Sequence, residues 1–377
     1  MKSVLFVNHT GQKGGAELFL VDLINHAPTN WAACFLSPGP AVDSISKDHE
    51  CFVLPAESDL LSIKRESSFL LQFLALFSLI KLSWNLSRVC SKYDVICANS
   101  QKSLFVAGLA SFFSRKPLVW ILHDIITDPA FSRLNRKAII AFTYLFCSKV
   151  LANSQASKEA FIASGGQEKK AGIIYNGFYV GEEEEDRALT KTLCPGKVAT
   201  VGLFSRISHW KGQHVLLAAL SQLKDVNAII VGAPLFGEEA YAEELRDMVD
   251  KLQLNDRVQF LGFRNDVKEL MKSVDIVVHT SIAAEPFGRV VVEGMISGTP
   301  VVATKGGGVT EIIREGETGI LVPPNEPDAL ASAIQTLLNN PDLYGRLSRN
   351  GLQEARDTYS INNTLHSFQN VLDTLEN

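Results

Sequence analysis

The sequence lacks the features of a metal centre, a disulfide framework and a nucleic-acid binder. Its six cysteines, spread over 377 residues, show neither metal-ligand spacing nor the density of a secreted disulfide-rich domain, so we expect reduced thiols and a cytoplasmic protein. No Asp-x-Asp pair follows a predicted strand, and we expect no metal or other cofactor. A net charge of −5 disfavours nucleic-acid binding. The N-terminal apolar run is too short for a signal peptide.

What the sequence does have is a globular composition and a regular alternation of apolar segments. It is 46% hydrophobic and 20% charged, which is typical of a folded protein, and its length favours two domains over one. Short apolar runs that fit strands alternate with segments of helical spacing along most of the chain. This alternation is typical of parallel sheets covered by helices on both faces. We therefore predict an α/β protein with two such domains.

The segment Ala284–Gly298 has the pattern of a strand end, a tight loop and a helix that begins near Phe287. It places Glu285 in the loop and Glu293 on the second helical turn, so that both carboxylates can reach the loop mouth. A helix start presents unpaired amides and a partial positive charge, which suit a phosphate or a sugar hydroxyl. The segment predicts a site for a polar, partly anionic ligand.

A second segment, Phe204–Gly212, follows another apolar strand and carries Arg206 and Lys211. Two fixed cations suit a diphosphate, because Arg forks onto two oxygens and Lys acts as a point charge. Carboxylates for hydroxyls and cations for phosphates together predict a nucleotide-sugar site. Taken singly, each of these four side chains fits an ordinary surface charge better than a ligand contact.

In their order along the chain, these motifs resemble the retaining glycosyltransferases of family 4. The two carboxylates, separated by seven residues, are followed by G-T-P-V-V-A-T (298–304), G-G-G-V-T-E-I-I (306–313) and G-E-T-G-I-L-V-P-P (316–324). The upstream Arg and Lys have the family's spacing as well. The resemblance covers nearly the whole chain and is strongest over residues 196–335.

The resemblance implies a GT-B fold, in which two Rossmann-like parallel-sheet domains face each other across a cleft. We expect an acceptor-binding domain over residues 1–190, a domain that binds the nucleotide-sugar donor over 191–360, and a last helix, 361–377, that packs back on the first domain. Asn176-Gly177 resembles the family's turn at the domain junction. The acidic run Glu182–Asp186 is best explained as a solvated linker or loop.

The resemblance also implies the roles of the donor-side residues. One departure is that His279-Thr280-Ser281 stands where the family often has Pro-Ser, which leaves the conformation of this loop open. Glu285, with amides near Phe287, Gly288 and Arg289, would bind sugar hydroxyls. Glu293 would bind the ribose. Arg206 and Lys211 would bind the diphosphate, and Arg264 would contact the base.

In the first domain, the candidates are a glycine-rich loop and a histidine. Gly14 and Gly15 open a predicted helix after the first strand and allow close backbone approach, although a plain glycine turn has the same sequence. His123 follows a predicted strand, where polar residues of a parallel sheet meet ligands. A lone histidine is as often structural. The resemblance implies that these glycines and Glu17 face the donor phosphate and that His123 contacts the sugar near the reacting centre.

The charge distribution raises a further possibility for the first domain. Residues 61–160 hold 13 Lys or Arg against 5 Asp or Glu, a net charge of +8, so that the rest of the chain carries −13. This imbalance is compatible with docking on an anionic membrane. The apolar run Phe69–Leu82 is too short to span a bilayer comfortably. A core helix is the simpler explanation, and an interfacial helix is the alternative, supported by Lys81, Trp84, Arg88 and Lys92.

These observations predict a retaining, metal-independent glycosyltransferase of the hexosyltransferase type. It would move a sugar from a nucleotide-sugar donor to a saccharide or lipid-linked acceptor in cell-surface polysaccharide or glycolipid synthesis. We expect it in the cytoplasm, with peripheral binding to the inner face of the plasma membrane as the membrane hypothesis. Two alternatives remain open at this point: a nucleotide-sugar epimerase of similar fold, and a non-catalytic nucleotide-sugar-binding module.

Overall fold

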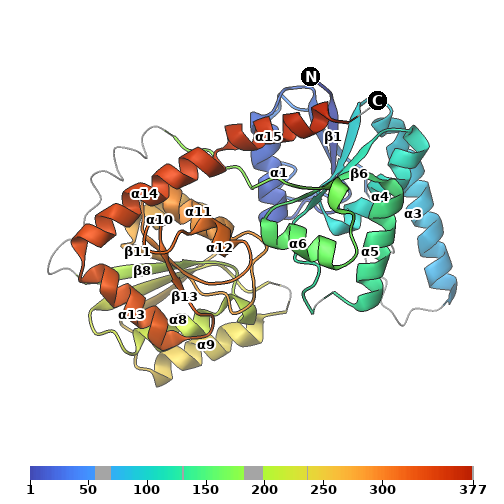
Figure 1. The fold of residues 1–377 in the computed structure, drawn as a ribbon. Helices are drawn as coiled ribbons and strands as arrows, with labels where there is room; N and C mark the ends of the chain where they lie inside the picture. Colours follow the sequence, from blue (N-terminus) through green and yellow to red (C-terminus); the bar gives the residue numbers. More distant parts are fainter. Residues whose placement is uncertain (56–68, 130, 182–197, 236, 376–377) are drawn as a thin grey trace. The chain divides into compact units, whose positions relative to one another are not determined.

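The computed structural model describes residues 1–55, 69–129, 131–181, 198–235 and 237–375, so the acidic run Glu182–Asp186 lies outside the described residues. The chain forms two compact units, each with its own parallel sheet (Figure 1). Unit 1 comprises Met1–Gly177 and Ile361–Asn377, and unit 2 comprises Phe178–Ser360. The break in unit 1 falls at the predicted junction turn.

Unit 1 is built on a seven-stranded sheet in the order β3-β2-β1-β4-β5-β6-β7, with every neighbouring pair parallel. Its strands are β1 (Val4–Asn8), β2 (Trp31–Phe35), β3 (Cys51–Val53), β4 (Val95–Ala98), β5 (Leu118–Leu122), β6 (Cys147–Ala152) and β7 (Ala171–Ile173). Its helices are α1 (Gly15–His26), α3 (Phe69–Cys90), α4 (Gln101–Ser114), α5 (Arg133–Phe146), α6 (Gln155–Ala163), the short η1 (Glu168–Lys170) and α15 (Ile361–Asp373).

The sheet of unit 1 has a hydrophobic core on each face, because successive side chains of a strand point to opposite sides. On β1, Leu5 and Val7 pack toward one core while Val4 and Phe6 pack toward the other. The second core includes Phe368 of α15, whose ring lies 5.5 Å from that of Phe6. The helix at the C-terminus of the chain therefore belongs to unit 1, beside α1 in Figure 1.

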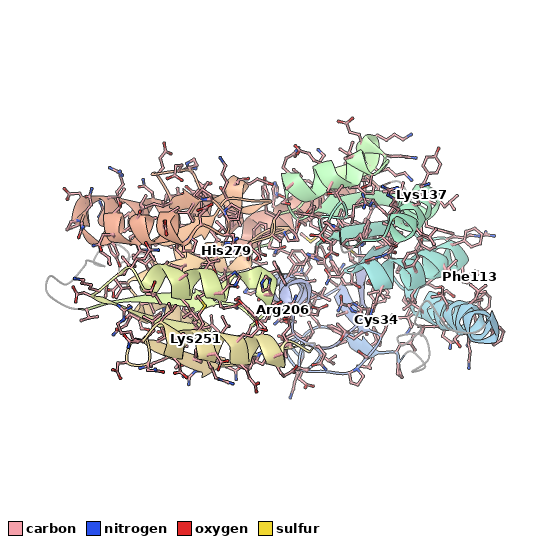
Figure 2. All side chains as sticks on the ribbon, turned by 90° about the horizontal axis from the view of Figure 1, so that it is seen from below. Cys34, Phe113, Lys137, Arg206, Lys251 and His279 are labelled. Carbon is pink, nitrogen blue, oxygen red and sulfur yellow. The ribbon has the colours of Figure 1, made fainter. Side chains whose placement is uncertain are left out.

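The cysteines of the described residues are free thiols. Cys34, Cys90, Cys97 and Cys147 are buried, and Cys51 is partly buried. Cys34 lies on β2, inside unit 1 (Figure 2). Burial raises the pKa of the Cys34 and Cys147 thiols to about 12, so these side chains pack as small apolar groups.

The helix predicted over Phe69–Leu82 is longer than expected and ends at Cys90. Leu82, Leu86 and Cys90 recur every four residues and are buried, so the same helical face continues for two further turns. Trp84 lies on the opposite side and is half exposed. Among the described residues, no helix combines the length and apolar character needed to cross a membrane.

Unit 2 is built on a six-stranded parallel sheet in the order β10-β9-β8-β11-β12-β13. Its strands are β8 (Ala199–Phe204), β9 (Val226–Val231), β10 (Val258–Gly262), β11 (Ile276–His279), β12 (Val301–Thr304) and β13 (Ile320–Val322). Its helices are the short η2 (His209–Lys211), α8 (Gln213–Leu220), α9 (Glu239–Lys251), α10 (Val267–Ser273), α11 (Arg289–Ile296), α12 (Val309–Ile312), α13 (Pro327–Leu338) and α14 (Pro341–Tyr359).

The strand order of unit 2 brings together the two segments that carry the predicted cations and carboxylates. β8 and β11 are neighbours although some 70 residues separate them, because the chain crosses over between β10 and β11. The loops after parallel strands emerge at the same edge of a sheet. The loop after β8 and the loop after β11 therefore meet at the carboxyl edge, where they form the candidate site of this unit.

Candidate active site

The loops after β8 and β11 are joined by hydrogen bonds to backbone carbonyls. The Ile282 amide donates to the Trp210 carbonyl at 2.8 Å, and the Thr280 hydroxyl donates to the Lys211 carbonyl at 2.8 Å. Gly212, which follows Lys211, has a φ of 69°, and a Cβ at this position would lie 2.0 Å from the backbone carbonyl oxygen of Thr280. Only glycine fits this close, left-handed approach. The arrangement fixes Lys211 against the loop that holds Glu285.

Three donors converge on one oxygen of Glu285. The Lys211 ammonium forms an ion pair with Oε1, the Ser281 hydroxyl donates to Oε1 at 2.7 Å, and Nε2 of His279 donates to it at 3.1 Å. The side chain is almost fully buried. The second oxygen, Oε2, has no hydrogen-bond partner among the described residues. Glu285 is thus held rigidly through one oxygen and keeps the other for a ligand.

The electrostatics of Glu285 favour its ionised form. Burial alone would raise the pKa of this carboxyl, but the nearby Lys211 charge and the hydrogen bond from His279 outweigh burial and hold its pKa well below its usual range. A charge kept in a buried position needs such compensation. The side chain is therefore a carboxylate at neutral pH and acts as a hydrogen-bond acceptor.

The backbone of Glu285 is held by the glycines of the 306–308 run. The Gly308 amide donates to the Glu285 carbonyl at 2.8 Å, and Gly307 forms an isolated parallel bridge with Glu285. Gly307 has a φ of 56°, and its Cβ would lie 2.0 Å from the same carbonyl oxygen. The contacts of Gly307 and Gly308 fix the backbone of Glu285 and so position its carboxylate, which gives a physical reason for the G-G-G run at 306–308.

Trp210 supports both predicted cations. The Lys211 ammonium lies 4.0 Å from the centre of its ring, and the Arg206 guanidinium lies 5.7 Å from it. Cations over an indole face are attracted by its quadrupole. The Arg206 carbonyl also accepts a hydrogen bond from Gln213 at 2.9 Å, which fixes the turn. Arg206, Lys211 and Glu285, predicted from separate segments, therefore lie at one place in unit 2.

The start of α11 lies beside this cluster. Gly288 is its N-terminal cap, with a φ of 103°, and no side chain caps the helix. Phe287 is buried and packs against Phe178 and Tyr359, so only its backbone can serve a ligand. Arg289 forms an ion pair with Glu293 at 3.2 Å, one turn further on. The Glu293 side chain remains 31% exposed.

Arg264 is placed differently from the buried pair. It follows β10 on the surface of unit 2 and forms a two-pronged ion pair with Asp266, in which Nε donates to Oδ1 at 2.7 Å and Nη2 to Oδ2 at 2.5 Å. This pairing occupies the fork of the guanidinium. A base contact by Arg264 therefore requires its backbone or a rearrangement of this pair, and its role stays a prediction.

In unit 1, His123 lies at the carboxyl edge of the sheet, immediately after β5. Its Nε2 hydrogen bonds to Oδ1 of Asn99 at 2.9 Å, and its ring packs edge-on against Phe19 at 5.2 Å. The Asn99 amide nitrogen already donates to Oδ1 of Asn8 at 3.2 Å and to the Ala16 carbonyl at 2.9 Å. The oxygen of Asn99 must therefore face His123, so Nε2 of His123 carries a proton.

This hydrogen-bond chain ends on a buried carboxyl. Asn8 donates to Oε1 of Glu17 at 2.9 Å, so that every bond from His123 through Asn99 and Asn8 is directed toward Glu17. Burial raises the pKa of Glu17, and its hydrogen bond from Asn8 opposes this. The chain fixes the tautomer of His123 and links it to the loop that carries Gly14.

Gly14 and Gly15 lie at the N-terminus of α1, as predicted from the sequence. Gly14 is the cap residue and has no side-chain cap, and Gly15 begins the helix. A Cβ on Gly14 would lie 2.8 Å from Oε2 of Glu17. The glycine therefore makes room for this carboxyl at the helix start.

Sequence reasoning missed the residues that hold the predicted ones in place. His279 and Ser281 lie exactly at the departure from the family pattern, yet both donate to the buried carboxylate. Trp210 lies in the predicted segment Phe204–Gly212, which gave it no role. Asn8 is the last residue of β1 and Asn99 directly follows β4, as His123 follows β5, and this position at the carboxyl end of a buried strand was the available signal.

Comparison with known proteins decides the family. Residues 184–354 match the profile of the glycosyl transferases group 1, and residues 13–180 match that of Glycosyltransferase Family 4. An uncharacterized glycosyltransferase of Methanocaldococcus jannaschii is 30% identical over 296 residues, which are 74% of this chain and 75% of the relative. The chain belongs to the family 4 glycosyltransferases. The predicted family, enzyme class and GT-B fold of this glycosyltransferase are confirmed.

A solved structure agrees with this assignment. The Anabaena protein Alr3699/HepE in complex with UDP and glucose is 36% identical to the glycosyltransferase, with a TM-score of 0.86 and 100% of both chains covered.

A further relative, found by sequence, matches a smaller part of the chain. D-inositol 3-phosphate glycosyltransferase of Corynebacterium glutamicum is 34% identical over 170 residues, which are only 43% of this chain and 40% of that relative.

Proposed function

We propose that this glycosyltransferase transfers a sugar from a uridine-diphosphate sugar, in the manner of UDP-glucose, to a saccharide or lipid-linked acceptor. The reaction would serve cell-surface polysaccharide or glycolipid synthesis in the cytoplasm. The observation that carries the proposal is the buried Lys211–Glu285 pair, in which one carboxylate oxygen is saturated and the other is available. Support for the donor comes from the Anabaena relative, solved with UDP and glucose and with UDP-glucose.

In this proposal, Glu285 binds sugar hydroxyls through Oε2. A carboxylate whose Oε1 accepts three hydrogen bonds has its charge partly neutralised, which makes it a poor nucleophile but leaves it a good acceptor. We propose that the reaction forms no covalent sugar intermediate. The acceptor would then attack from the face that the diphosphate leaves, and the anomeric configuration would be retained.

Arg206 and Lys211 would stabilise the departing diphosphate. The Lys211 ammonium has three N–H groups and gives one to Glu285, so two remain for phosphate oxygens. Preorganised cations that face developing negative charge lower the barrier of such a reaction. They can supply the charge that a divalent metal would otherwise bring. His123, presented by its hydrogen-bond chain in unit 1, would contact the transferred sugar.

The test is a comparison of variants in UDP binding and in sugar transfer. Arg206→Met should weaken UDP binding roughly 10- to 100-fold, the value of one charge-assisted hydrogen bond, measured by calorimetry. Arg246→Met, an exposed arginine of α9, is the matched control and should leave binding unchanged. Equal affinity of Arg206→Met and wild type would place the diphosphate elsewhere.

Transfer itself needs a separate readout, because a binding module would also bind UDP. Glu285→Gln keeps the shape of the side chain and removes its charge, so UDP release from UDP-glucose in an acceptor mixture should fall by at least about 100-fold. Addition of EDTA should leave wild-type turnover unchanged. Turnover that is lost on chelation would disprove metal independence, and near-normal turnover of Glu285→Gln would disprove the role of this carboxylate.

A further inference from the structure

Unit 1 has a surface of exposed apolar side chains on three adjacent helices, α3, α4 and α5 (Figure 1). Eight of the fourteen exposed large hydrophobic side chains in the described residues lie on these helices, so they are concentrated here instead of scattered. We call this surface the α3–α5 face. Its exposed apolar members are Leu76, Phe77, Ile80, Trp84, Phe112, Leu134, Tyr144 and Leu145.

Aromatic contacts make most of this face continuous from one helix to the next. Trp84 of α3 meets Phe113 of α4 edge-on at 5.4 Å, and Figure 2 shows Phe113 on the side of α4 that faces α3. Phe112 of α4 meets Phe146 of α5 edge-on at 6.2 Å. The side chains of Phe112 and Leu145 are 66% and 72% exposed. The exposed rings of Trp84 and Phe112 are therefore joined to partly buried rings beneath them, Phe113 and Phe146, of which Phe146 packs against the core of unit 1.

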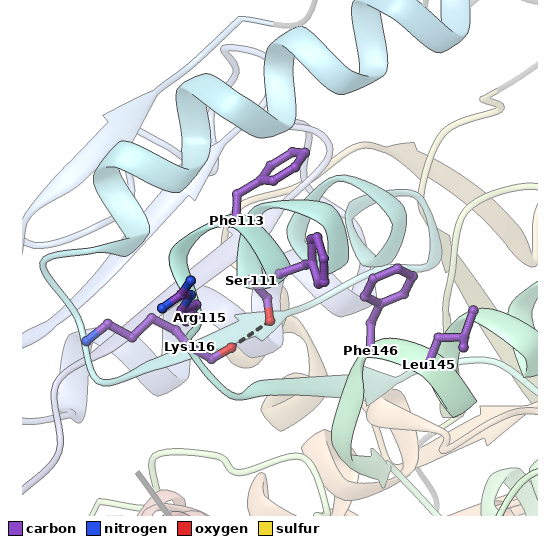
Figure 3. A pocket seen from close by; sticks show the side chains of 7 residues that line it. Ser111, Phe113, Arg115, Lys116, Leu145 and Phe146 are labelled. Carbon is purple, nitrogen blue, oxygen red and sulfur yellow. Dashed lines mark hydrogen bonds between the residues drawn. The ribbon is translucent and has the colours of Figure 1, made fainter.

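A hollow of about 590 Å³ opens where α4 and α5 end (Figure 3). It is lined by Phe112, Phe113, Leu145 and Phe146 together with Ser111, Arg115 and Lys116. The turn that carries the two cations is fixed: Arg115 caps α4 with a φ of 56°, and the Ser111 hydroxyl donates to the Lys116 carbonyl at 2.6 Å. The lining of the hollow therefore combines four apolar side chains with two cations.

The charge of the α3–α5 face has one sign only. From Leu76 to Cys90 on α3, along α4 with its two-residue cap, and along α5, there are eight Lys or Arg and no Asp or Glu. The carboxylate of Asp94, just before β4, is near Lys116. Hydrogen bonds from Ser3 are the main cause of its lowered pKa, and the charge of Lys116 is a smaller cause. The cations carried by these helices and the α4 cap are Lys81, Arg88, Lys102, Arg115, Lys116, Arg133, Arg136 and Lys137, of which Lys116 and Arg136 are partly buried.

We propose that the α3–α5 face docks onto an anionic lipid bilayer and that the hollow receives the apolar part of one lipid beneath a headgroup held by Arg115 and Lys116. Aromatic and aliphatic side chains insert into the interface, while Lys and Arg extend along the apolar surface and keep their charges at headgroup level. A second copy of this chain is a poor occupant, because a symmetric contact would press the eight cations of one copy against those of the other.

The test is sedimentation of the full-length protein with vesicles of phosphatidylcholine alone or mixed with phosphatidylglycerol. We expect binding to the mixed vesicles, loss of that binding at high salt, and little binding to phosphatidylcholine. Arg115→Gln with Lys116→Gln should weaken binding roughly 25-fold, about fivefold for each cation. Phe112→Ser with Leu145→Ser should weaken it at least about tenfold.

Two matched controls on unit 2 test whether vesicle binding depends on the α3–α5 face itself or on any loss of surface charge or apolar surface. Arg246→Gln with Lys251→Gln removes two exposed cations of α9, and Leu235→Ser with Phe263→Ser removes two exposed apolar side chains. Both should bind vesicles like wild type. Equal effects of face and control variants, or no binding to mixed vesicles, would overturn the proposal. So would a dimer in sedimentation equilibrium that Phe112→Ser dissociates, since the occupant would then be a second copy.

Vesicle binding and sugar transfer are separate measurements. The variants of the α3–α5 face should keep wild-type UDP affinity, because they leave Arg206, Lys211 and Glu285 untouched. Failure of the docking proposal would therefore leave the proposed reaction standing, and failure of the proposed reaction would leave the docking surface standing.

Discussion

Replacement of Lys211 by Met should destabilise unit 2 far more than removal of an ordinary ion-pair lysine. The side chains of Lys211 and Glu285 are only 16% and 10% exposed. Met keeps most of the length of the Lys stem and removes the charge, so that the carboxylate is left buried without its cation. Breaking a buried pair from one side costs about 3–5 kcal/mol. The loss should appear in the unfolding free energy of unit 2.

Lys272→Met is the matched control, since this lysine of α10 pairs with Glu269, whose side chain is 64% exposed. The Lys272 side chain is 13% exposed, close to the value for Lys211, but its partner carboxylate lies in water and loses little when the lysine is removed, so we expect this ion pair to contribute about 0–1 kcal/mol. The two variants differ in the burial of the carboxylate left behind. The double change Lys211→Met with Glu285→Gln should recover part of the loss, because it removes the unpaired charge.

The loss of unfolding free energy in Lys211→Met should also depend on pH, which gives a second, independent test. In the wild type, the pKa of Glu285 lies below its ordinary value of 4.5, so its contribution to stability is present above that pH and is lost as the pH falls further. Without Lys211, burial acts with less opposition and raises the pKa, so stability is then lost as the pH rises above 4.5. The difference in unfolding free energy between wild type and Lys211→Met should be largest at neutral pH and should decrease toward pH 4.5.

Hydrogen exchange followed by mass spectrometry suits this measurement, because it reports the opening of β11 and α11 separately from unit 1. Urea titrations at pH 5 and pH 7 would supply the free energies. Equal deficits for Lys211→Met and Lys272→Met would refute the reasoning. A deficit that stays constant between the two pH values would refute the assigned electrostatics of the carboxylate.

Other predictions concern the supports of the two sites. Asn99→Leu removes the acceptor of His123, at a cost of about 1–3 kcal/mol, and should shift the imidazole ¹⁵N signals away from the Nε2–H tautomer; unchanged signals would contradict the hydrogen-bond chain. Gly307→Ala should cost more stability than Gly316→Ala, because both have positive φ but only Gly307 lies against a backbone oxygen, that of Glu285, so equal thermal shifts would contradict this close contact. Phe368→Ala should cost about 3–5 kcal/mol in unit 1, measured by urea unfolding, and a loss below about 1 kcal/mol would contradict its packing in the core.

The strand and helix alternation was sufficient to predict the fold class, but the neighbours in each sheet were not readable from it. Parallel sheets have buried strands whose apolar runs look alike, so nothing in Val277–Val278 shows that β11 lies beside β8. The resemblance in motifs supplied this information indirectly, through the spacing of Arg206, Lys211 and Glu285. Their actual meeting is a consequence of the crossover, which only the structure displays.

The supporting residues could not be predicted for a related reason. Ser281 and His279 are ordinary residues in sequence, and their value comes from the path of the loop after β11, which brings Oε1 of Glu285 back within reach of both side chains. Likewise, the burial of Asn8 and Asn99 follows from strand order, which places their side chains at one edge. The charge count did indicate that the first domain is basic, because charge is local in sequence, whereas a core helix was the simpler explanation of Phe69–Leu82.

The loop at His279-Thr280-Ser281 departs from the family pattern in sequence while it performs a necessary task in the structure. A buried carboxylate requires several donors, and Lys211 alone supplies one. His279 and Ser281 supply two more to the same oxygen, and the Thr280 hydroxyl fastens the loop to the Lys211 carbonyl. All three side chains of the departure are therefore used within one cluster. Since the donors gather on Oε1, the loop both stabilises the charge of Glu285 and determines which of its oxygens is left to meet a substrate.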